Sequence, residues 1–295
     1  MGSRTDSLGG KVAFITGGGG GVGAEVSRRL HRKGVKLMLV DVDPDALEAH
    51  AASLGDDVAT AVADVRDLAA MQAAADAAVE RFGGIDIVMA NAGVASYGSV
   101  QQVDPEAVKR LLDINVLGVF HTVRATLPSV IGRRGYVLIV SSLAAYAASP
   151  GLAPYNASKA AVEQFANALR LEVAHRGVAV GSAHMSWIDT AMVQDSKADL
   201  PSFGEMLSKL PPPLSSTTSV TACGEAFVRG IERRARRINC PGWVEAFRWL
   251  KPVLSTRLGE LPVLRLVSDL LPRMDAEVAA LGRSASAHTE SIGSR

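Results

Sequence analysis

The stretch KVAFITGGGGGVG, residues 11–23, decides the fold of this chain. Its first six residues form an apolar run rich in β-branched and aromatic side chains, which is typical of a buried strand. A run of glycines then makes a turn, and a helical pattern follows over residues 24–33. Glycine lets the backbone approach a pyrophosphate closely, and a helix start offers free N–H groups and the positive end of its dipole. The sequence therefore predicts a dinucleotide phosphate site rather than a flexible linker.

The alternation of strand and helix continues along the chain. Branched apolar runs predict further strands at residues 35–40, 58–63, 85–90, 136–140 and 178–183, with a short strand near Ile238. Helical patterns separate these runs, and Asp43, Asp67 and Asp104 stand where helix N-caps are expected. Strands that are apolar on both faces and alternate with helices indicate a parallel sheet covered on both sides. The expected fold class is α/β, a doubly wound, three-layer α/β/α Rossmann domain over residues 1–240.

Composition narrows the class of protein further. The chain has 295 residues, 48% of them apolar, and a net charge of +1. With a net charge this close to zero, the chain as a whole has no strong positive potential that would attract nucleic acid or an anionic membrane. Neither partner is therefore expected. Two cysteines do not build a disulfide framework, and the first ten residues lack the apolar core of a signal peptide. No apolar stretch approaches the length of a membrane span, ~18 residues. We therefore expect a cytoplasmic protein without a metal site.

Three side chains in the middle of the chain can form an acid/base site. Tyr155 and Lys159 are four residues apart, so they share one face of a helix. A free tyrosine titrates near ~10, and a neighbouring ammonium group favours its phenolate. Ser142, at the end of an apolar run, can hold a carbonyl oxygen beside the phenol. Together these residues predict proton transfer to or from a substrate oxygen.

Asp41 bears on the choice of cofactor. It ends the second expected strand, 24 residues after Gly17. A carboxylate in that place can accept hydrogen bonds from both hydroxyls of an adenosine ribose, and it would repel a 2′-phosphate. Neither lysine nor arginine lies in the glycine turn or directly after Asp41, where a phosphate would need one. NAD(H) is therefore favoured over NADP(H), and the alternative is that Asp41 only caps the next turn.

These residues belong to a longer series of motifs, listed in chain order as Thr16-Gly17-x-x-x-Gly21-Val22-Gly23, Asn91-Ala92-Gly93, Asn115, Ser142, and Tyr155 with Lys159. In this order and spacing they resemble the short-chain dehydrogenase/reductases, in their compact single-domain branch, over residues 8–240. The resemblance implies hydride transfer to or from a nicotinamide, with Tyr155 as general acid/base and Lys159 also binding the nicotinamide ribose. It further implies homodimers or homotetramers that pair through the helices containing Asn115 and Tyr155.

The resemblance also assigns contacts around the cofactor. Asp64 and Val65 match the segment that contacts adenine, and Asn91-Ala92-Gly93 matches the segment under the adenosine ribose. Asn115 matches a residue that kinks a helix and holds a water beside the lysine, forming a proton relay. Ile188 and Thr190 align with contacts to the nicotinamide carboxamide and the phosphate.

One segment departs from the family's pattern, which has Pro-Gly after the sixth strand. Met185 and Ser186 stand there, and the change either reshapes the turn beside the nicotinamide or only adds side chains to the pocket. His184 is interpreted as a structural histidine rather than a second base, because Tyr155 already fills that role. Ser141 is set aside in favour of Ser142, because adjacent strand residues point to opposite faces.

The substrate is expected to meet residues 191–220 and the end of the chain. Residues 192–214 lack steady periodicity and are interrupted by prolines, which suits a mobile lid. Apolar side chains here and near the site predict an apolar substrate, such as a lipid, steroid, terpenoid or aromatic; they are Phe203, Met206, Leu207, Leu210, Leu143, Ala144, Ala145, Ala148 and Tyr97. We expect an enzyme that interconverts a secondary alcohol and a ketone. A nicotinamide-dependent epimerase or dehydratase, or a non-catalytic dinucleotide-binding protein, stays open as an alternative.

Residues 241–282 extend beyond the family's common length. Apolar residues recur there at helical spacing among several basic ones, which predicts a helical extension. It could form an interfacial pair of helices on a membrane, or cover the pocket or a subunit contact, and we favour the packing interpretation. Residues 283–295 are rich in serine and predict a disordered tail.

Overall fold

The structure is a computed structural model that describes residues 7–293. In this part of the chain seven parallel strands form one sheet in the order β3-β2-β1-β4-β5-β6-β7. Their bounds are β1 Val12–Thr16, β2 Lys36–Asp41, β3 Val58–Val62, β4 Ile87–Ala90, β5 Tyr136–Val140, β6 Ala179–Met185 and β7 Arg237–Cys240. The doubly wound parallel sheet expected from the sequence is therefore confirmed.

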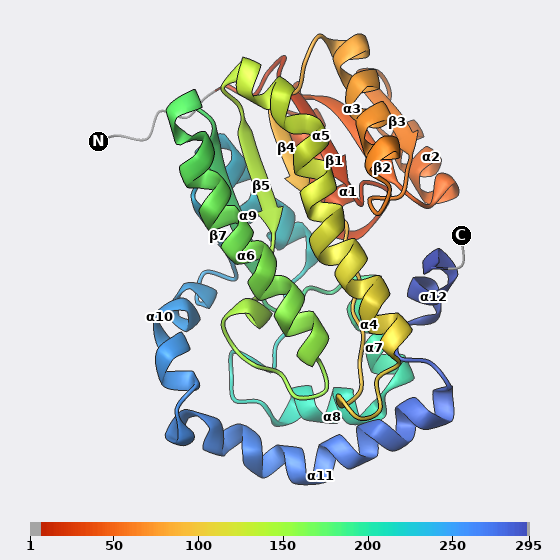
Figure 1. Cartoon of the computed structure of the whole chain (residues 1–295), viewed down its shortest axis with the longest axis vertical. Helices are drawn as coiled ribbons and strands as arrows, with labels where there is room; N and C mark the ends of the chain where they lie inside the picture. Colours follow the sequence, from red (N-terminus) through yellow and green to blue (C-terminus); the bar gives the residue numbers. More distant parts are fainter. Residues whose placement is uncertain (1–6, 294–295) are drawn as a thin grey trace.

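Helices cover both faces of the sheet, which gives the three layers seen in Figure 1. One face is covered by α3 (Leu68–Phe82), α5 (Gly118–Arg133) and α6 (Ala153–Val173), and the other by α1 (Gly21–His31), α2 (Pro44–Ala52) and α9 (Val220–Glu232). Strand side chains alternate between the two cores, since Phe14 packs with the first set and Ala13 and Ile15 with the second. Both cores are apolar, as the near-continuous apolar strands predict.

The turn between β1 and α1 is the tightest junction of the fold. Gly17 adopts a left-handed conformation with φ of +65°. A Cβ at Gly23 would lie 2.0 Å from the carbonyl oxygen of Gly17, so the helix can start this close to the strand only with glycine there. The caps of the following helices are the expected ones, because the carboxylates of Asp43, Asp67 and Asp104 accept backbone N–H groups at the starts of α2, α3 and α4.

The helix expected after Asp104 is not regular throughout. It comprises α4 (Pro105–Leu112), a π-helical turn η1 (Asp113–Leu117) and α5. Among the described residues this rod, 105–133, is the helix that is long and apolar enough to cross a membrane, but half of its most apolar window is buried inside the protein. The rod is accordingly a core helix in one of the two helical layers that cover the sheet. Two 3₁₀ turns, η2 (Leu143–Ala145) and η3 (Ala174–Arg176), follow β5 and α6.

The remaining helices lie beyond the edge where the strands end. They are α7 (Ala191–Asp199), α8 (Pro201–Lys209), α10 (Val244–Leu254), α11 (Arg257–Leu281) and α12 (Ala287–Gly293). In Figure 1 this group forms the lower part of the molecule, with α11 along its rim. Polar contacts tie α8 to α11, because Ser202 Oγ donates to Glu277 over 2.5 Å and Arg273 pairs with Glu205 at 2.7 Å. The helical extension is thus present, and the expected lid is two short helices.

The described part of the expected disordered tail, residues 283–293, contains helix α12 and makes contacts with distant residues. The carbonyl oxygen of Ser284 accepts from Tyr97 N at 2.9 Å, and its hydroxyl accepts from Asp104 N at 2.9 Å. Glu290 pairs with Arg110 at 2.6 Å. Ser284, one of the serines that suggested disorder, therefore bonds two backbone N–H groups of a distant loop, which no local pattern indicates. Residues 294 and 295 lie outside the described range.

A substitution at the β1–α1 junction tests this packing. Gly23→Ala places a methyl group against the Gly17 carbonyl, so we expect the melting temperature of the ligand-free protein to fall by about 5 °C or more. Gly20→Ala is the matched control, because a Cβ there meets nothing within 4 Å and the backbone is extended. Its melting temperature should stay within about 2 °C of wild type. Equal melting temperatures for the two variants would contradict the close approach.

Candidate active site

The candidate site lies along the carboxyl edge of the sheet. Residues at the carboxyl ends of β2 to β6, or up to three positions beyond them, gather there: Asp41, Asp64, Asn91, Ser142 and Ile188. They line one cavity of about 1110 Å³ that runs from the glycine turn to the helices beyond the sheet edge. A crevice at the carboxyl ends of parallel strands is the usual ligand site of open α/β sheets.

The glycine turn and the segment after β4 are held together by side-chain hydrogen bonds. Thr16 Oγ1 accepts from the backbone N–H groups of Asn91 (3.1 Å) and Ala92 (3.2 Å). Asn91 Nδ2 donates to the carbonyl oxygens of Thr16 (3.0 Å) and Gly17 (3.2 Å). Thr16 and Asn91 therefore fix the shape of the turn, while Gly17, Gly21, Val22, Ala92 and Gly93 line the cavity.

Asp41 stands at the mouth of this turn. Its Oδ2 accepts from Gly19 N at 2.9 Å, and its Oδ1 accepts from Val42 N at 2.8 Å. Oδ1 also accepts from Asp43 N at 3.2 Å, so Oδ2 is the oxygen that retains a lone pair for a ribose hydroxyl. The glycine turn therefore fixes the orientation of the Asp41 carboxylate through Gly19 N. A residue that only capped the next turn would not need this contact.

The nucleotide half of the cavity is short of positive charge. Of the described residues that line the cavity, Lys159 is the one cation, whereas Asp41, Asp43 and Asp64 are acidic. The nearby Arg66 is engaged elsewhere, since its Nε donates to Asp64 Oδ2 over 2.7 Å and this hydrogen bond raises the pKa of the guanidinium. Asp64 and Val65 both line the cavity beside it. No described basic side chain is therefore placed there to receive a 2′-phosphate.

Helix α6 carries Tyr155 and Lys159 on the face that lines the cavity, opposite Ser142. Lys159 is buried, with its Nζ donating to Val140 O at 3.2 Å and lying 5.6 Å from the centre of the Tyr155 ring. Gly93 allows this approach, because a Cβ there would be 3.4 Å from Lys159 Nζ. The structure thus brings together the three side chains that the sequence singled out.

The electrostatics of the pair differ from the expected effect of an ammonium group on a phenol. Burial lowers the pKa of Lys159 to about 8. Burial raises the pKa of Tyr155, and the hydrogen bond with Ser142 opposes this only in part. The expected lowering of the Tyr155 pKa is not found in the ligand-free protein, because loss of solvent disfavours the phenolate. Tyr155 is therefore a protonated phenol at neutral pH.

Asn115 lies in the π-helical turn and is fully buried. Its Oδ1 accepts from Val94 N at 2.8 Å, and its Nδ2 donates to Val94 O at 2.9 Å and to Ser158 Oγ at 3.1 Å. The side chain thus joins the rod, the loop after β4 and α6, rather than facing the cavity. A π turn at this place is a common feature of functional sites.

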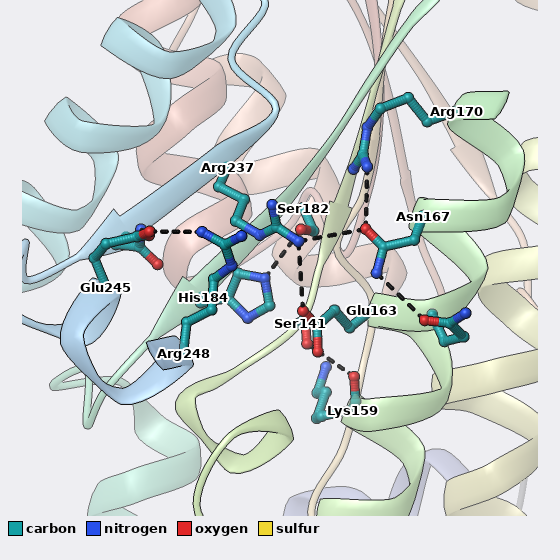
Figure 2. Close-up of polar contacts among 12 residues, drawn as sticks. Ser141, Lys159, Glu163, Asn167, Arg170, Ser182, His184, Arg237, Glu245 and Arg248 are labelled. Atoms are coloured by element: carbon teal, nitrogen blue, oxygen red, sulfur yellow. Dashed lines mark hydrogen bonds and ion pairs between the residues drawn. The ribbon is translucent and has the colours of Figure 1, made fainter. Parts of the chain in front are cut away.

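Figure 2 shows the polar groups on the far side of Lys159. Ser141 Oγ donates to Lys159 O at 2.8 Å, so it holds helix α6 and leaves Ser142 to face the cavity. His184 is fully buried, stacks on Tyr146 at a centroid distance of 4.4 Å and lies 3.0 Å from Ser182 Oγ. Burial lowers the pKa of His184 to about 4. It is neutral and outside the cavity lining, in agreement with the structural interpretation.

The departure from Pro-Gly adds side chains to the cavity. Met185 and Ser186 both line it, and the backbone is held in place by Ser186 N, which donates to Cys240 O at 2.9 Å. The hydroxyl of Ser186 is buried without a hydrogen-bond partner among the described residues. Beyond it lie Ile188 and Thr190, which also line the cavity. Ser186 is therefore a polar group left available to a bound ligand.

The far half of the cavity is mostly apolar. Leu143, Ala144, Ala148, Tyr97, Phe203 and Leu210 line it as the sequence predicted, whereas Met206, Leu207 and Ala145 pack beside it. Its outer wall comes from α10 and α11 through Phe247, Leu254, Val263 and Leu266. Covering the pocket was one of the two packing arrangements expected for residues 241–282, but the helical spacing alone did not say which face contacts the pocket.

Comparisons with known proteins agree with this geometry. Residues 11–201 match the family described as short chain dehydrogenase. SadH of Mycobacterium tuberculosis, which is named an oxidoreductase, is 34% identical over 274 residues, covering 83% of this chain and 99% of SadH. A short chain dehydrogenase/reductase of Burkholderia phymatum, solved with NAD, superposes with a TM-score of 0.75 at 26% identity, covering 88% and 96% of the two chains. The 3-ketoacyl-(acyl-carrier-protein) reductase of Brucella melitensis, solved with NADH, has a TM-score of 0.70 at 29% identity, with 79% and 97% covered.

The buried histidine gives the protein a defined acid sensitivity. His184 has a pKa of about 4 in the fold and 6.5 when unfolded, so the unfolded chain binds the extra proton between these values. Its contribution to stability is complete above pH 6.5 and is lost as pH falls to about 4, a change on the order of 3 kcal/mol. His184→Gln should flatten the unfolding free energy across that window, measured by urea unfolding. The exposed His175→Gln is the control, and an unchanged slope in His184→Gln would contradict the assignment.

Proposed function

Because the chain belongs to the short chain dehydrogenase family, we propose that it is an NAD(H)-dependent oxidoreductase that interconverts a secondary alcohol and a ketone on an apolar small molecule. The observation that carries this proposal is the convergence of Tyr155, Ser142 and Lys159 on one cavity that begins at a glycine turn. The rest of that cavity supplies the two other requirements, a place for a dinucleotide and an apolar place for a substrate.

The residues at the sheet edge fit an NAD dinucleotide. The glycine turn and the start of α1 present backbone N–H groups to a pyrophosphate. Asp41 accepts from the adenosine ribose, Asp64 and Val65 border the adenine, and Ala92 and Gly93 lie beneath the ribose. Ile188 and Thr190 border the carboxamide and phosphate. When bound, the cofactor supplies a hydride donor or acceptor at the nicotinamide C4. The Burkholderia and Brucella structures, which hold NAD and NADH, support the same choice.

The protonation states favour Tyr155 as the proton donor to a ketone. Its raised pKa keeps the phenol protonated at neutral pH, so it can give a proton to the oxygen as the carbon accepts a hydride. Ser142 donates a hydrogen bond to the same oxygen and stabilises the charge that develops there. Lys159, with a pKa near 8, is placed to hold the nicotinamide ribose and to restore the proton to Tyr155. Asn115 positions α6 against the loop after β4, and the relay water beside Lys159 that the family resemblance implies stays part of this proposal. In the oxidative direction the same groups act in reverse.

The far half of the cavity suits an apolar substrate. Leu152, Trp187, Phe203, Phe247 and Leu266 line it, and polar groups are few. The reductase of Brucella melitensis is named for a 3-ketoacyl substrate, which supports reduction of a ketone. Oxidation of NADH in a panel of apolar ketones separates an enzyme from a silent binding protein.

The assembly and location also belong to this proposal. We infer a homodimer or homotetramer in the cytoplasm that pairs through the α4–α5 rod and α6. Leu117 and Phe120 on the rod are 48% and 44% exposed, and Phe120 meets Phe165 of α6 edge-on at 6.2 Å. Exposed apolar groups of this kind are typical of subunit contacts.

The cofactor preference is tested at Asp41. Asp41→Ala removes the repulsion of a 2′-phosphate and two charge-assisted hydrogen bonds, so NAD should bind about tenfold more weakly or worse while NADP gains relatively. Fluorescence titration with NADH and NADPH measures both. Asp43→Ala is a useful companion, because Asp43 lines the same end of the cavity and should have the smaller effect. A wild-type protein that prefers NADPH would contradict the proposal.

The chemical role of Tyr155 is tested by Tyr155→Phe, which keeps the ring and removes the proton. We expect turnover to fall at least ~10²-fold, the usual contribution of a general acid or base. Binding of NADH, measured by fluorescence titration, should be retained and serves as the folding control. Turnover close to that of wild type would remove Tyr155 from the mechanism.

A further inference from the structure

The outer face of α10 and of the first half of α11 presents large apolar side chains to solvent. We call six of them the outer patch; their exposed fractions run from 44% to 79%, and they are Trp249, Leu250, Val253, Leu258, Leu261 and Leu264. Isolated exposed apolar residues are ordinary, but six within sixteen residues of chain form a cluster that usually marks an interaction surface.

These helices are apolar on both faces. Phe247, Leu254 and Leu266 line the cavity, while the outer patch, apart from Leu264 at the boundary, lies on the other side. The second half of α11 is different, because Leu270, Met274 and Val278 are buried at four-residue intervals and the remaining face is small or polar. A helix that is apolar all round belongs in apolar surroundings, so the first half of α11 lacks a partner on its outer side.

The same segment carries more positive than negative charge. Residues 248–268 contain four cations, Arg248, Lys251, Arg257 and Arg265, against one carboxylate, Glu260. Their net charge of +3 compares with +1 for the whole chain, so the remainder carries −2. Arg257, Arg265 and Glu260 are all exposed, and Glu260 also borders the cavity. The Arg248 guanidinium lies 4.3 Å from the centre of the Trp249 ring but is paired with Glu245 at 2.9 Å, so Lys251, Arg257 and Arg265 are the cations available to a partner.

We propose that the outer patch docks on the surface of an anionic phospholipid bilayer. In this arrangement the leucine and valine side chains enter the boundary of the acyl chains and the arginines and lysine meet lipid phosphates. Trp249 suits the interface, where the indole ring is commonly found. The proposal goes beyond the redox chemistry and does not depend on it. It also replaces the packing interpretation for the outer face, while the inner face covers the pocket as expected.

A second copy of the chain fits this surface less well. A symmetric contact would place the same patch on both partners, so the four cations of one copy would meet the four of the other. Like charges brought together in this way oppose association. A bilayer that carries negative charge complements the patch instead. The patch also continues to the cavity, since Leu264 belongs to both, and in Figure 1 α11 forms the free rim of the molecule.

Flotation of the full-length chain tests the proposal. Vesicles of phosphatidylcholine mixed with phosphatidylglycerol should carry the protein upward, and vesicles of phosphatidylcholine alone should carry much less. The double variant Trp249→Ala/Leu258→Asn should reduce the bound fraction about tenfold. Leu171→Asn on α6 is the matched control, because Leu171 is 76% exposed and Leu258 is 79% exposed; it should float like wild type.

The contribution of the positive charges beside the outer patch is tested with a separate variant. Arg257→Glu/Arg265→Glu should reduce binding to the mixed vesicles to the level of neutral ones, with Arg176→Glu as a control far from the patch. NADH titration and thermal melting verify folding, and all the substituted side chains are exposed. Absence of flotation, or flotation unaffected by the patch variants, would overturn the proposal. So would light scattering in which the patch variant separates a dimer into monomers while no vesicle is bound, because a second copy would then be the occupant.

Discussion

Seven parallel strands that all end at one edge of the sheet are the constraint on which the rest of this protein depends. Residues at or just beyond the ends of the strands meet at that edge, so Asp41, Asn91 and Ser142 line one cavity although they are far apart in sequence. The arrangement needs α1 to begin directly against β1. Glycine at positions 17 and 23 permits this approach, and Thr16 and Asn91 then bond the turn to the neighbouring strand.

Burial at this edge has opposite effects on the two titratable groups of α6. It lowers the pKa of Lys159 and raises that of Tyr155, and both shifts disfavour charge in a site with little solvent. In the ligand-free protein Tyr155 is therefore protonated, so it can donate a proton but is not yet a base. A spacing of four residues places the two groups on one face, but the sequence does not reveal how much water reaches them. The sign of the shift for Tyr155 could only come from the structure.

The sequence correctly predicted features that depend on residues close together in the chain. Strand β5 falls at residues 136–140 as expected, and the Asp caps of α2, α3 and α4 follow from side-chain preferences. Features set by distant contacts were missed. Helices α7 and α8 have weak periodicity and are fixed by contacts such as Ser202 with Glu277 and Arg283 with Asp199. The π turn at Asn115 depends on the loop around Val94, and the tail is ordered by backbone groups of the loop that begins at Tyr97.

The cavity wall formed by residues 191–214 and 244–289 lies outside the sheet and comes late in the chain. The glycine turn, Asp41, Asn91 and the Tyr155 helix all precede it in sequence. Changes of length or side chain in the wall can therefore accumulate without altering the backbone that aims the redox groups. Natural variation, or deliberate exchange of these segments between relatives, can alter what the cavity accepts while the earlier part is inherited unchanged. The two halves of the cavity are free to evolve at different rates.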